Sequence, residues 1–290
     1  MLPDGEPVRR EPRLSRLLRT ALQAVYGRYV PESVKSSLRL QRALRRHDVE
    51  PAPATPPTGR VVVLAPHMDD DVFGCGGTIA LAADAGARVA CVYVTDATPH
   101  HPGNSDTAPL SVPLASERRE EARRAAAVLG VTDLVFLYQS DRVLAVTDDA
   151  VAALADALAR RPPSAVLLPF LSDPHHAHWI TNGLFLEAAR RARLPSSVVC
   201  WGYEVWTPLT ANAVVDITAS ADRKRLAMQA FGSQRSEPDY ARVMLGLNTY
   251  RSLHRGRAQG LAEAFHVADL RVYRRLFEMV ADGVGRGAVA

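Results

Sequence analysis

Short apolar runs alternate with helical patterns along most of the chain. The runs are rich in Val, Leu and Ala, and the stretches between them are of helical length. Strands are expected at residues 60–64, 88–94, 134–137, 165–170, 198–200 and 213–217. Helices are expected at residues 71–85, 114–129, 150–160, 178–193, 221–231 and 240–253, the last of which closes the domain. This alternation predicts an α/β fold with a Rossmann-like, mostly parallel sheet flanked by helices on both faces.

The N-terminal segment follows a different pattern. Apolar residues at helical spacing predict an amphipathic helix there: Leu14, Leu17, Leu18, Leu22 and Val25. A second helix is expected over residues 34–44. The Pro-rich stretch 51–57 cannot form a helix or a central strand, and we interpret it as a linker. We therefore divide the chain into an N-terminal helical extension with its linker, residues 1–57, and a main domain, residues 58–290.

The net charge of +4 is concentrated in the extension. Residues 1–50 contain eleven Lys or Arg and six Asp or Glu, so the rest of the chain is close to neutral. No nucleic acid is therefore expected as a partner of the main domain, and the extension lacks the interleaved aromatic residues of a single-strand groove. The extension either packs on the main domain or makes a peripheral contact, through residues 1–50, with an anionic membrane surface or partner.

Composition narrows the class of protein further. Hydrophobic residues make up 47% of the chain, which is enough for a sizeable core. No apolar run is long enough for a membrane span, and the N-terminus lacks the apolar core of a signal peptide, so we expect a soluble, cytoplasmic protein. Cys75, Cys91 and Cys200 form no CxxC pair and are expected to be buried as small hydrophobic residues.

Side chains capable of metal chemistry follow two of the expected strands. The first strand end is followed by one histidine and three acids, and the second by three histidines: His67, Asp69, Asp70, Asp71, His175, His176 and His178. Acids at a helix start can be capping residues, but capping does not account for the histidines. Because the carboxyl ends of parallel strands meet at one crevice, we expect a site there. Two histidines and one carboxylate would bind zinc and leave a position open for water.

Several motifs occur in a fixed order over residues 60–266. They are Pro66-His67-x-Asp69-Asp70-Asp71 with Gly76-Gly77, Arg118-x-x-Glu121 with Leu129-Gly130-Val131, Asp173-Pro174-His175-x-x-His178, and then Asp216-Ile217-Thr218, Lys224, Ser233-Gln234 and Ala262-Glu263-Ala264-Phe265. The ordered set resembles the LmbE-like (PIG-L) family of zinc-dependent deacetylases. That family removes the acetyl group from N-acetylglucosamine in glycolipids, thiol precursors and glycosylated natural products.

The resemblance implies one Zn²⁺ per chain, or another divalent metal, held by His67, Asp70 and His178. It implies that Asp69 is the general base and that His175 stabilises or protonates the reacting group. Simple chemistry agrees: when Asp70 binds the metal, its neighbour can take a proton from the attacking water, and a cationic His175 would favour the oxyanion. The implied substrate is an N-acetylglucosamine-type amino sugar in a glycan, glycolipid or glycosylated metabolite.

Two further residues are candidates for substrate binding. Arg118 contacts substrate hydroxyls or phosphate, unless it is a solvated residue at a helix start. Asp141 follows another strand end and either binds sugar hydroxyls or caps a turn. The long loop at residues 95–113 is typical of a lid or a recognition element.

The chain departs from the family pattern at two positions. Asp71 stands where the family usually has Glu, and helix capping is its best explanation. Ala177 occupies a position where the family often has Asp, which removes an expected hydrogen-bond acceptor for His175 or His178. A zinc-binding but catalytically altered α/β protein that binds a glycan or partner is therefore the alternative function.

A nucleotide-dependent α/β enzyme, such as a methyltransferase, is a third hypothesis. Gly74, Gly76 and Gly77 lack the GxGxxG order, and acids occupy the turn where a pyrophosphate would bind. We interpret these glycines as positions where a helix packs closely against the sheet.

Overall fold

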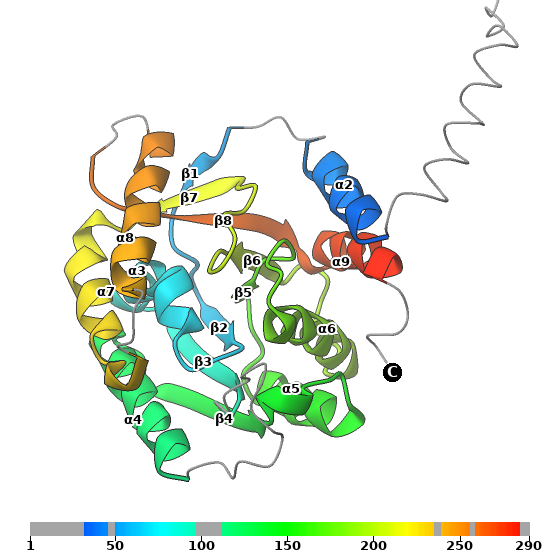
Figure 1. The fold of residues 1–290 in the computed structure, drawn as a ribbon, viewed down its shortest axis with the longest axis horizontal. Helices are drawn as coiled ribbons and strands as arrows, with labels where there is room; N and C mark the ends of the chain where they lie inside the picture. The colour runs from blue at the N-terminus through cyan, green and yellow to red at the C-terminus, as the bar shows by residue number, and fades with distance from the viewer. Residues whose placement is uncertain (1–31, 46–49, 97–111, 235–238, 256–258, 285–290) are drawn as a thin grey trace, which may run out of the picture.

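The computed structural model describes residues 32–45, 50–96, 112–234, 239–255 and 259–284. Within them, one eight-stranded sheet has the order β1-β7-β8-β6-β5-β2-β3-β4 (Figure 1). The strands are β1 Ala52–Ala54, β2 Arg60–Ala65, β3 Arg88–Thr95, β4 Asp133–Gln139, β5 Ala165–Pro169, β6 Val199–Tyr203, β7 Ala213–Asp216 and β8 Ala262–Asp269. Strand β8 is antiparallel to β6 and β7, and every other pair is parallel. The mostly parallel sheet is confirmed.

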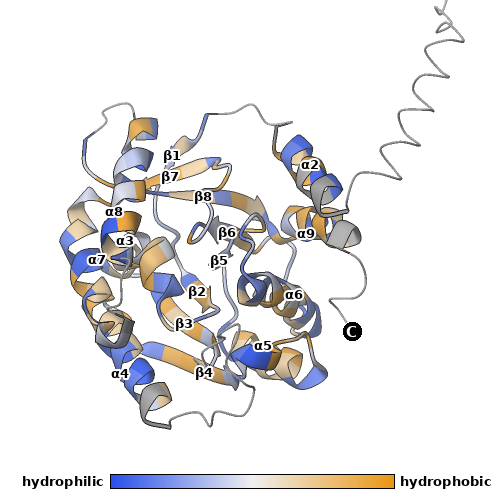
Figure 2. Ribbon diagram, in the orientation of Figure 1, coloured by the Kyte–Doolittle hydropathy of each residue, from blue (hydrophilic) through white to orange (hydrophobic). Residues whose placement is uncertain are grey.

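Helices cover both faces of the sheet (Figure 1). One face carries α2 Glu32–Arg45, α5 Asp148–Arg160, α6 His176–Arg191 and α9 Leu270–Val284. The other carries α3 Asp70–Asp84, α4 Val112–Leu129, α7 Ala221–Met228 and α8 Tyr240–Arg251. Alternate residues of β2 enter the two cores, with Val62 and Leu64 in the first and Val61 and Val63 in the second. Figure 2 shows the hydrophobic strands β2, β3 and β4 between these layers.

The expected elements between residues 60 and 253 are confirmed to within a few residues. The second helix of the extension is also confirmed, because α2 forms and packs against α9. The amphipathic helix expected near Leu14 lies outside the described residues, so its contact with an anionic surface stays a prediction. No helix of the described part has the length and apolar character needed to cross a membrane.

Two expectations at the ends of the domain are wrong. Residues 52–54, inside the stretch that we interpreted as a linker, form β1 and pair in parallel with β7. Proline is compatible with this strand because β1 lies at the sheet edge. The helix at 240–253 does not close the domain, since β8 and α9 follow it. The division of the chain at residue 57 stays a prediction.

The order of the strands reverses at β2. The chain passes from β2 outward to β3 and β4, and then returns to β5 on the other side of β2. A crevice forms at the carboxyl ends of the strands at such a reversal, and ligands of doubly wound folds bind there. The segments that follow β2 and β5 therefore meet at one place.

Helix α3 is interrupted at Cys75, where the backbone is not helical (φ −144°, ψ 20°). A Cβ atom at Gly74 would lie 2.4 Å from Cδ2 of Tyr203 on β6, and one at Gly77 would lie 2.7 Å from Cβ of Ile217. At Gly76 the nearest side-chain atoms are at ordinary contact distance. The packing interpretation is therefore confirmed for Gly74 and Gly77.

Candidate metal centre

Asp70 lies between two histidines that come from different strand ends. Its Oδ2 atom is 3.1 Å from Nδ1 of His67 and 3.2 Å from Nε2 of His178. The backbone N–H of His67 donates to the same oxygen at 2.8 Å, which fixes the carboxylate at the start of α3. Thus the end of β2 and the start of α6 place three potential ligand atoms around one point.

The donor set and its spacing fit a single tetrahedral zinc ion. Two atoms bound at about 2.1 Å to such an ion lie about 3.4 Å apart, close to the two distances to Asp70. Neither ring nitrogen of His178 has a hydrogen bond of good geometry, although the ring is fully buried. Ligand nitrogens of His67, His175 and His178 all lie within 4.8 Å of one another. These three histidines form a group that could hold an ion, and Asp70 lies between two of them, so the ligand set of His67, Asp70 and His178 stays a prediction.

Each of the two histidines beside Asp70 has a second carboxylate near its other ring nitrogen. Asp141 Oδ1 is 3.4 Å from Nε2 of His67, and Asp173 Oδ2 is 3.2 Å from Nδ1 of His178. Carboxylates in this position fix the orientation of a metal-binding imidazole and raise its basicity. The structure therefore places Asp141 beside His67, a candidate metal ligand. Neither of the two roles expected for Asp141, sugar binding or turn capping, predicts this contact.

Asp173 supplies a hydrogen-bond acceptor for His178, which Ala177 cannot provide. Ala177 is buried in the apolar core on the α6 face of the sheet. Asp173 instead reaches His178, and its carboxylate also accepts the backbone N–H groups of His175 (3.0 Å) and Trp206 (3.1 Å). The departure at Ala177 thus leaves His178 with a carboxylate partner from another position.

The charges of the cluster depend on one another. Burial alone would raise the pKa of Asp70, but the facing His178 and His67 rings hold it well below its usual range. Burial alone would lower the pKa of His178, but Asp70 and Asp173 raise it to about 9. The pKa of His67 is likewise raised, against burial, by Asp70 and Asp141. Each carboxylate and the ring beside it thus shift the pKa of the other in the direction that favours the charged form.

Asp69 and His175 flank this cluster. Burial and the adjacent Asp70 carboxylate raise the pKa of Asp69 to about 6, while the positive charge of Arg118 acts in the opposite direction. The ring of His175 stands 4.9 Å from that of His67, centroid to centroid. Burial, together with the His178 and His67 rings, lowers the pKa of His175, whereas Asp70 and Asp141 act in the opposite direction. Every sequence-predicted site residue is thus near the cluster.

Asp71 is not a helix cap, which corrects the sequence interpretation. Its side chain is fully buried and accepts a hydrogen bond from the hydroxyl of Tyr93 on β3 at 2.9 Å. Asp69 occupies the N-cap position of α3 and makes no side-chain capping bond. Burial raises the pKa of Asp71 to about 7. The residue therefore links α3 to the neighbouring strand.

Sequence reasoning also missed what two motif acids do behind the site. Glu263 of β8 accepts the backbone N–H groups of Gly77 (2.9 Å) and Thr78 (2.7 Å), just after the break in α3, and Lys224 Nζ at 2.6 Å. Glu121 of α4 accepts the backbone N–H and the hydroxyl of Ser233 at 2.7 and 2.6 Å. The sequence analysis names both acids only as parts of motifs. Their partners, Lys224 and Ser233, belong to other motifs of the same ordered set. The presence of an acid in one motif and a polar donor in another is the signal that could have indicated these contacts.

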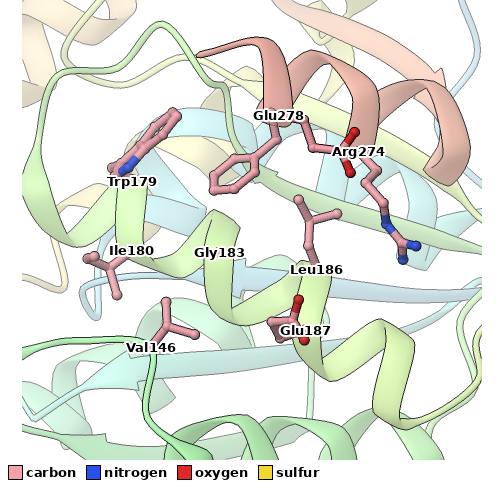
Figure 3. Close-up of a pocket in the computed structure, with 9 residues that line it drawn as sticks. Val146, Trp179, Ile180, Gly183, Leu186, Glu187, Arg274 and Glu278 are labelled. Atoms are coloured by element: carbon pink, nitrogen blue, oxygen red, sulfur yellow. The ribbon is translucent and has the colours of Figure 1, made fainter. Parts of the chain in front are cut away.

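Other features add no competing chemistry in the described residues. The three cysteines are free and buried, as expected. Most of the loop expected to be a lid, residues 97–111, lies outside the described part. A cavity of about 150 Å³ between α6 and α9 is lined mainly by apolar side chains, including Val146, Trp179 and Phe277, with charged side chains at Glu187, Arg274 and Glu278 (Figure 3). No metal-ligand candidate lines it.

The chain is similar to known deacetylases. The family model described as GlcNAc-PI de-N-acetylase, PIG-L, matches residues 62–189. Diacetylchitobiose deacetylase of Thermococcus kodakarensis is 32% identical over 142 residues, which cover 47% of this chain and 51% of that protein. The match thus spans about half the length of this relative.

Solved structures share the fold. N,N'-diacetylchitobiose deacetylase of Pyrococcus horikoshii has a TM-score of 0.64 and 23% identity, with 81% of this chain and 91% of that chain covered. GalB, the 4-carboxy-2-hydroxymuconate hydratase of Pseudomonas putida, has a TM-score of 0.61 and 25% identity, with 73% and 96% covered. Because these two proteins are named for different reactions, the fold alone does not assign one here. The residues matched by the family model include His67, Asp70 and His178, and over residues 62–189 the chain is similar to the PIG-L (LmbE-like) family.

Proposed function

We propose that the protein is a metal-dependent hydrolase that removes the N-acetyl group from an N-acetylglucosamine-type amino sugar. The observation that carries this proposal is the single Asp70 oxygen held 3.1 and 3.2 Å from two histidine nitrogens, each with a further carboxylate on its other nitrogen. The relatives named as deacetylases of acetylated sugars support the choice of substrate class.

In this proposal His67, Asp70 and His178 hold one zinc or other divalent ion. When bound, such an ion supplies Lewis-acid stabilisation of negative charge and lowers the pKa of water. Asp69 is next to the proposed ligand Asp70 but makes no capping bond, so in this proposal its carboxylate is the general base. It takes a proton from the attacking water.

His175 faces the cluster from the start of α6 and acts on the substrate in this proposal. It stabilises negative charge on the carbonyl oxygen and passes a proton to the nitrogen. The water oxygen bonds to the carbonyl carbon and the C–N bond breaks, so the products are acetate and a free amine. In this proposal Arg118, whose charge acts on Asp69, binds the substrate near the base.

Acetate release from a panel of N-acylated glucosaminides tests the function directly. Metal-stripped protein and protein reloaded with zinc are compared, and the free amine is measured in parallel. We expect equal amounts of acetate and amine from the reloaded protein only. Metal binding without acetate release from any member would overturn the proposal and favour the alternative of a catalytically altered zinc-binding protein that binds a glycan or partner.

A further inference from the structure

An exposed tryptophan lies beside the candidate metal centre. Trp206 is 52% exposed, whereas the other two tryptophans, Trp179 and Trp201, are partly or fully buried. Its ring is nearly parallel to that of His175, with an interplanar angle of 16° and 6.2 Å between centroids. The ring of Tyr240 lies 5.6 Å from that of Trp206, centroid to centroid, and is nearly perpendicular to it. About half of the tryptophan surface is thus exposed next to a residue of the reactive cluster.

The segment that carries Trp206 is held in place on both sides. Glu204 and Arg251 form a buried two-bond pair, at 2.9 and 2.6 Å. Glu204 also accepts the backbone N–H of Leu209, and Arg251 donates to the carbonyl of the same residue. A buried ion pair needs good geometry and full hydrogen bonding to offset its desolvation, and this pair has both. The exposure of Trp206 is therefore imposed by a braced loop.

The backbone of Trp206 is tied to the metal centre itself. Its N–H donates to Oδ2 of Asp173, the oxygen that lies 3.2 Å from Nδ1 of His178. One carboxylate therefore sets both the orientation of a candidate ligand ring and the position of the tryptophan. A displacement of either would be transmitted to the other.

We propose that Trp206 is a binding residue that packs against the less polar face of the pyranose ring carrying the scissile acetamide. This rests on the proposed function and names the ring as the part of the substrate that the site selects. A pyranose has one face rich in C–H groups, and a rigid indole offers a large apolar surface at little conformational cost. Sites for small polar ligands combine such a surface with a few fixed polar groups, here supplied by the metal centre.

The test compares a cyclic substrate with a ring-opened one. Methyl N-acetylglucosaminide and N-acetylglucosaminitol carry the same acetamide and similar hydroxyls, but only the first has a ring face. We expect Trp206→Ala to lower kcat/KM about tenfold for the cyclic substrate, mainly through KM, and to leave the ring-opened substrate nearly unaffected. Trp206→Phe should restore most of the lost preference. Leu226→Ala, at a residue 54% exposed on α7, is the matched control and should change neither value.

Binding gives a second measurement that does not depend on turnover. In the Asp69→Ala background, titration calorimetry with methyl N-acetylglucosaminide should show a Kd about tenfold higher after Trp206→Ala. Metal content and Tm should be the same in both proteins. An unchanged preference for the ring, with acetate still released, would overturn the role of Trp206 alone. Absence of acetate from the unmodified protein with either substrate would overturn the proposed function instead.

Discussion

Nδ1 of His178 lies 3.2 Å from Oδ2 of Asp173, on the ring edge opposite Asp70. Asp173 comes from the turn after β5, five residues before the histidine that it supports. The family often has Asp at position 177, where this chain has Ala. In this chain the carboxylate beside His178 comes from Asp173 instead.

Replacing this carboxylate should weaken metal binding without unfolding the turn. In Asp173→Asn the remaining side-chain oxygen can still accept the N–H group of His175, but the acceptor for the N–H group of Trp206 and the negative charge next to His178 are lost. We expect zinc affinity to fall about 10- to 100-fold, measured by competition with a chelator. Asp222→Asn, at a residue that is almost fully exposed, is the control. Equal affinity in the two variants would contradict the role of Asp173.

His67→Ala and Asp69→Ala should separate metal binding from turnover. The first removes a ligand candidate and should abolish stoichiometric zinc binding, together with acetate release. The second should keep the metal, because Asp69 makes no capping bond, and should lower kcat by about 100-fold or more. Metal content by elemental analysis and acetate release are measured on the same samples. Equal loss of metal in both variants would contradict separate roles for His67 as a ligand and Asp69 as the base.

Glu263→Gln should destabilise the fold strongly although it lies behind the site. Glu263 and Lys224 are fully buried, so the neutral side chain leaves the lysine charge without its partner. We expect a loss of about 3–5 kcal/mol in the free energy of unfolding, measured with urea. Asp84→Asn, which breaks the exposed pair of Asp84 and Arg223, should cost less than about 1 kcal/mol. Similar losses in both would contradict the buried pair as a determinant of stability.

Adding one methyl group to α3 should lower the free energy of unfolding, whereas adding one to α8 should raise it. Gly74→Ala would place a Cβ atom 2.4 Å from the Tyr203 ring, whose hydroxyl is bonded to the carbonyl of Leu64. We expect a loss of about 1–3 kcal/mol. Gly246→Ala, where a Cβ atom would have no neighbour within 4 Å, should gain about 0.5–1 kcal/mol from helix propensity. Thermal and urea unfolding measure both, and a stable Gly74→Ala protein would show that Tyr203 can move.

The sequence was sufficient for what depends on local periodicity and strand ends. The apolar runs gave the parallel strands, and the two histidine-bearing strand ends predicted one crevice, because parallel strands place their carboxyl ends together. Contacts between residues that are distant in the chain could not be predicted from the sequence. The local sequence favours a helix cap at Asp71, because its partner, Tyr93, belongs to a strand distant in the sequence. Strand β8 is not predicted, because an acid such as Glu263 within a short apolar segment suggests a solvent-exposed position. In the structure Glu263 is buried, and it pairs with Lys224 and with amides of α3.

The position of β8 has a consequence for the order in which the sheet can be completed. β8 lies between β6 and β7, and β1 reaches the sheet through β7. While the chain is being synthesised, β2 to β6 can therefore assemble as they emerge, but β1 and β7 have only each other until residues 262–269 leave the ribosome. Strand β1, which is synthesised first, can therefore join the rest of the sheet only after β8, which is synthesised last. During that interval the unpaired edge of β6 can pair with a wrong strand.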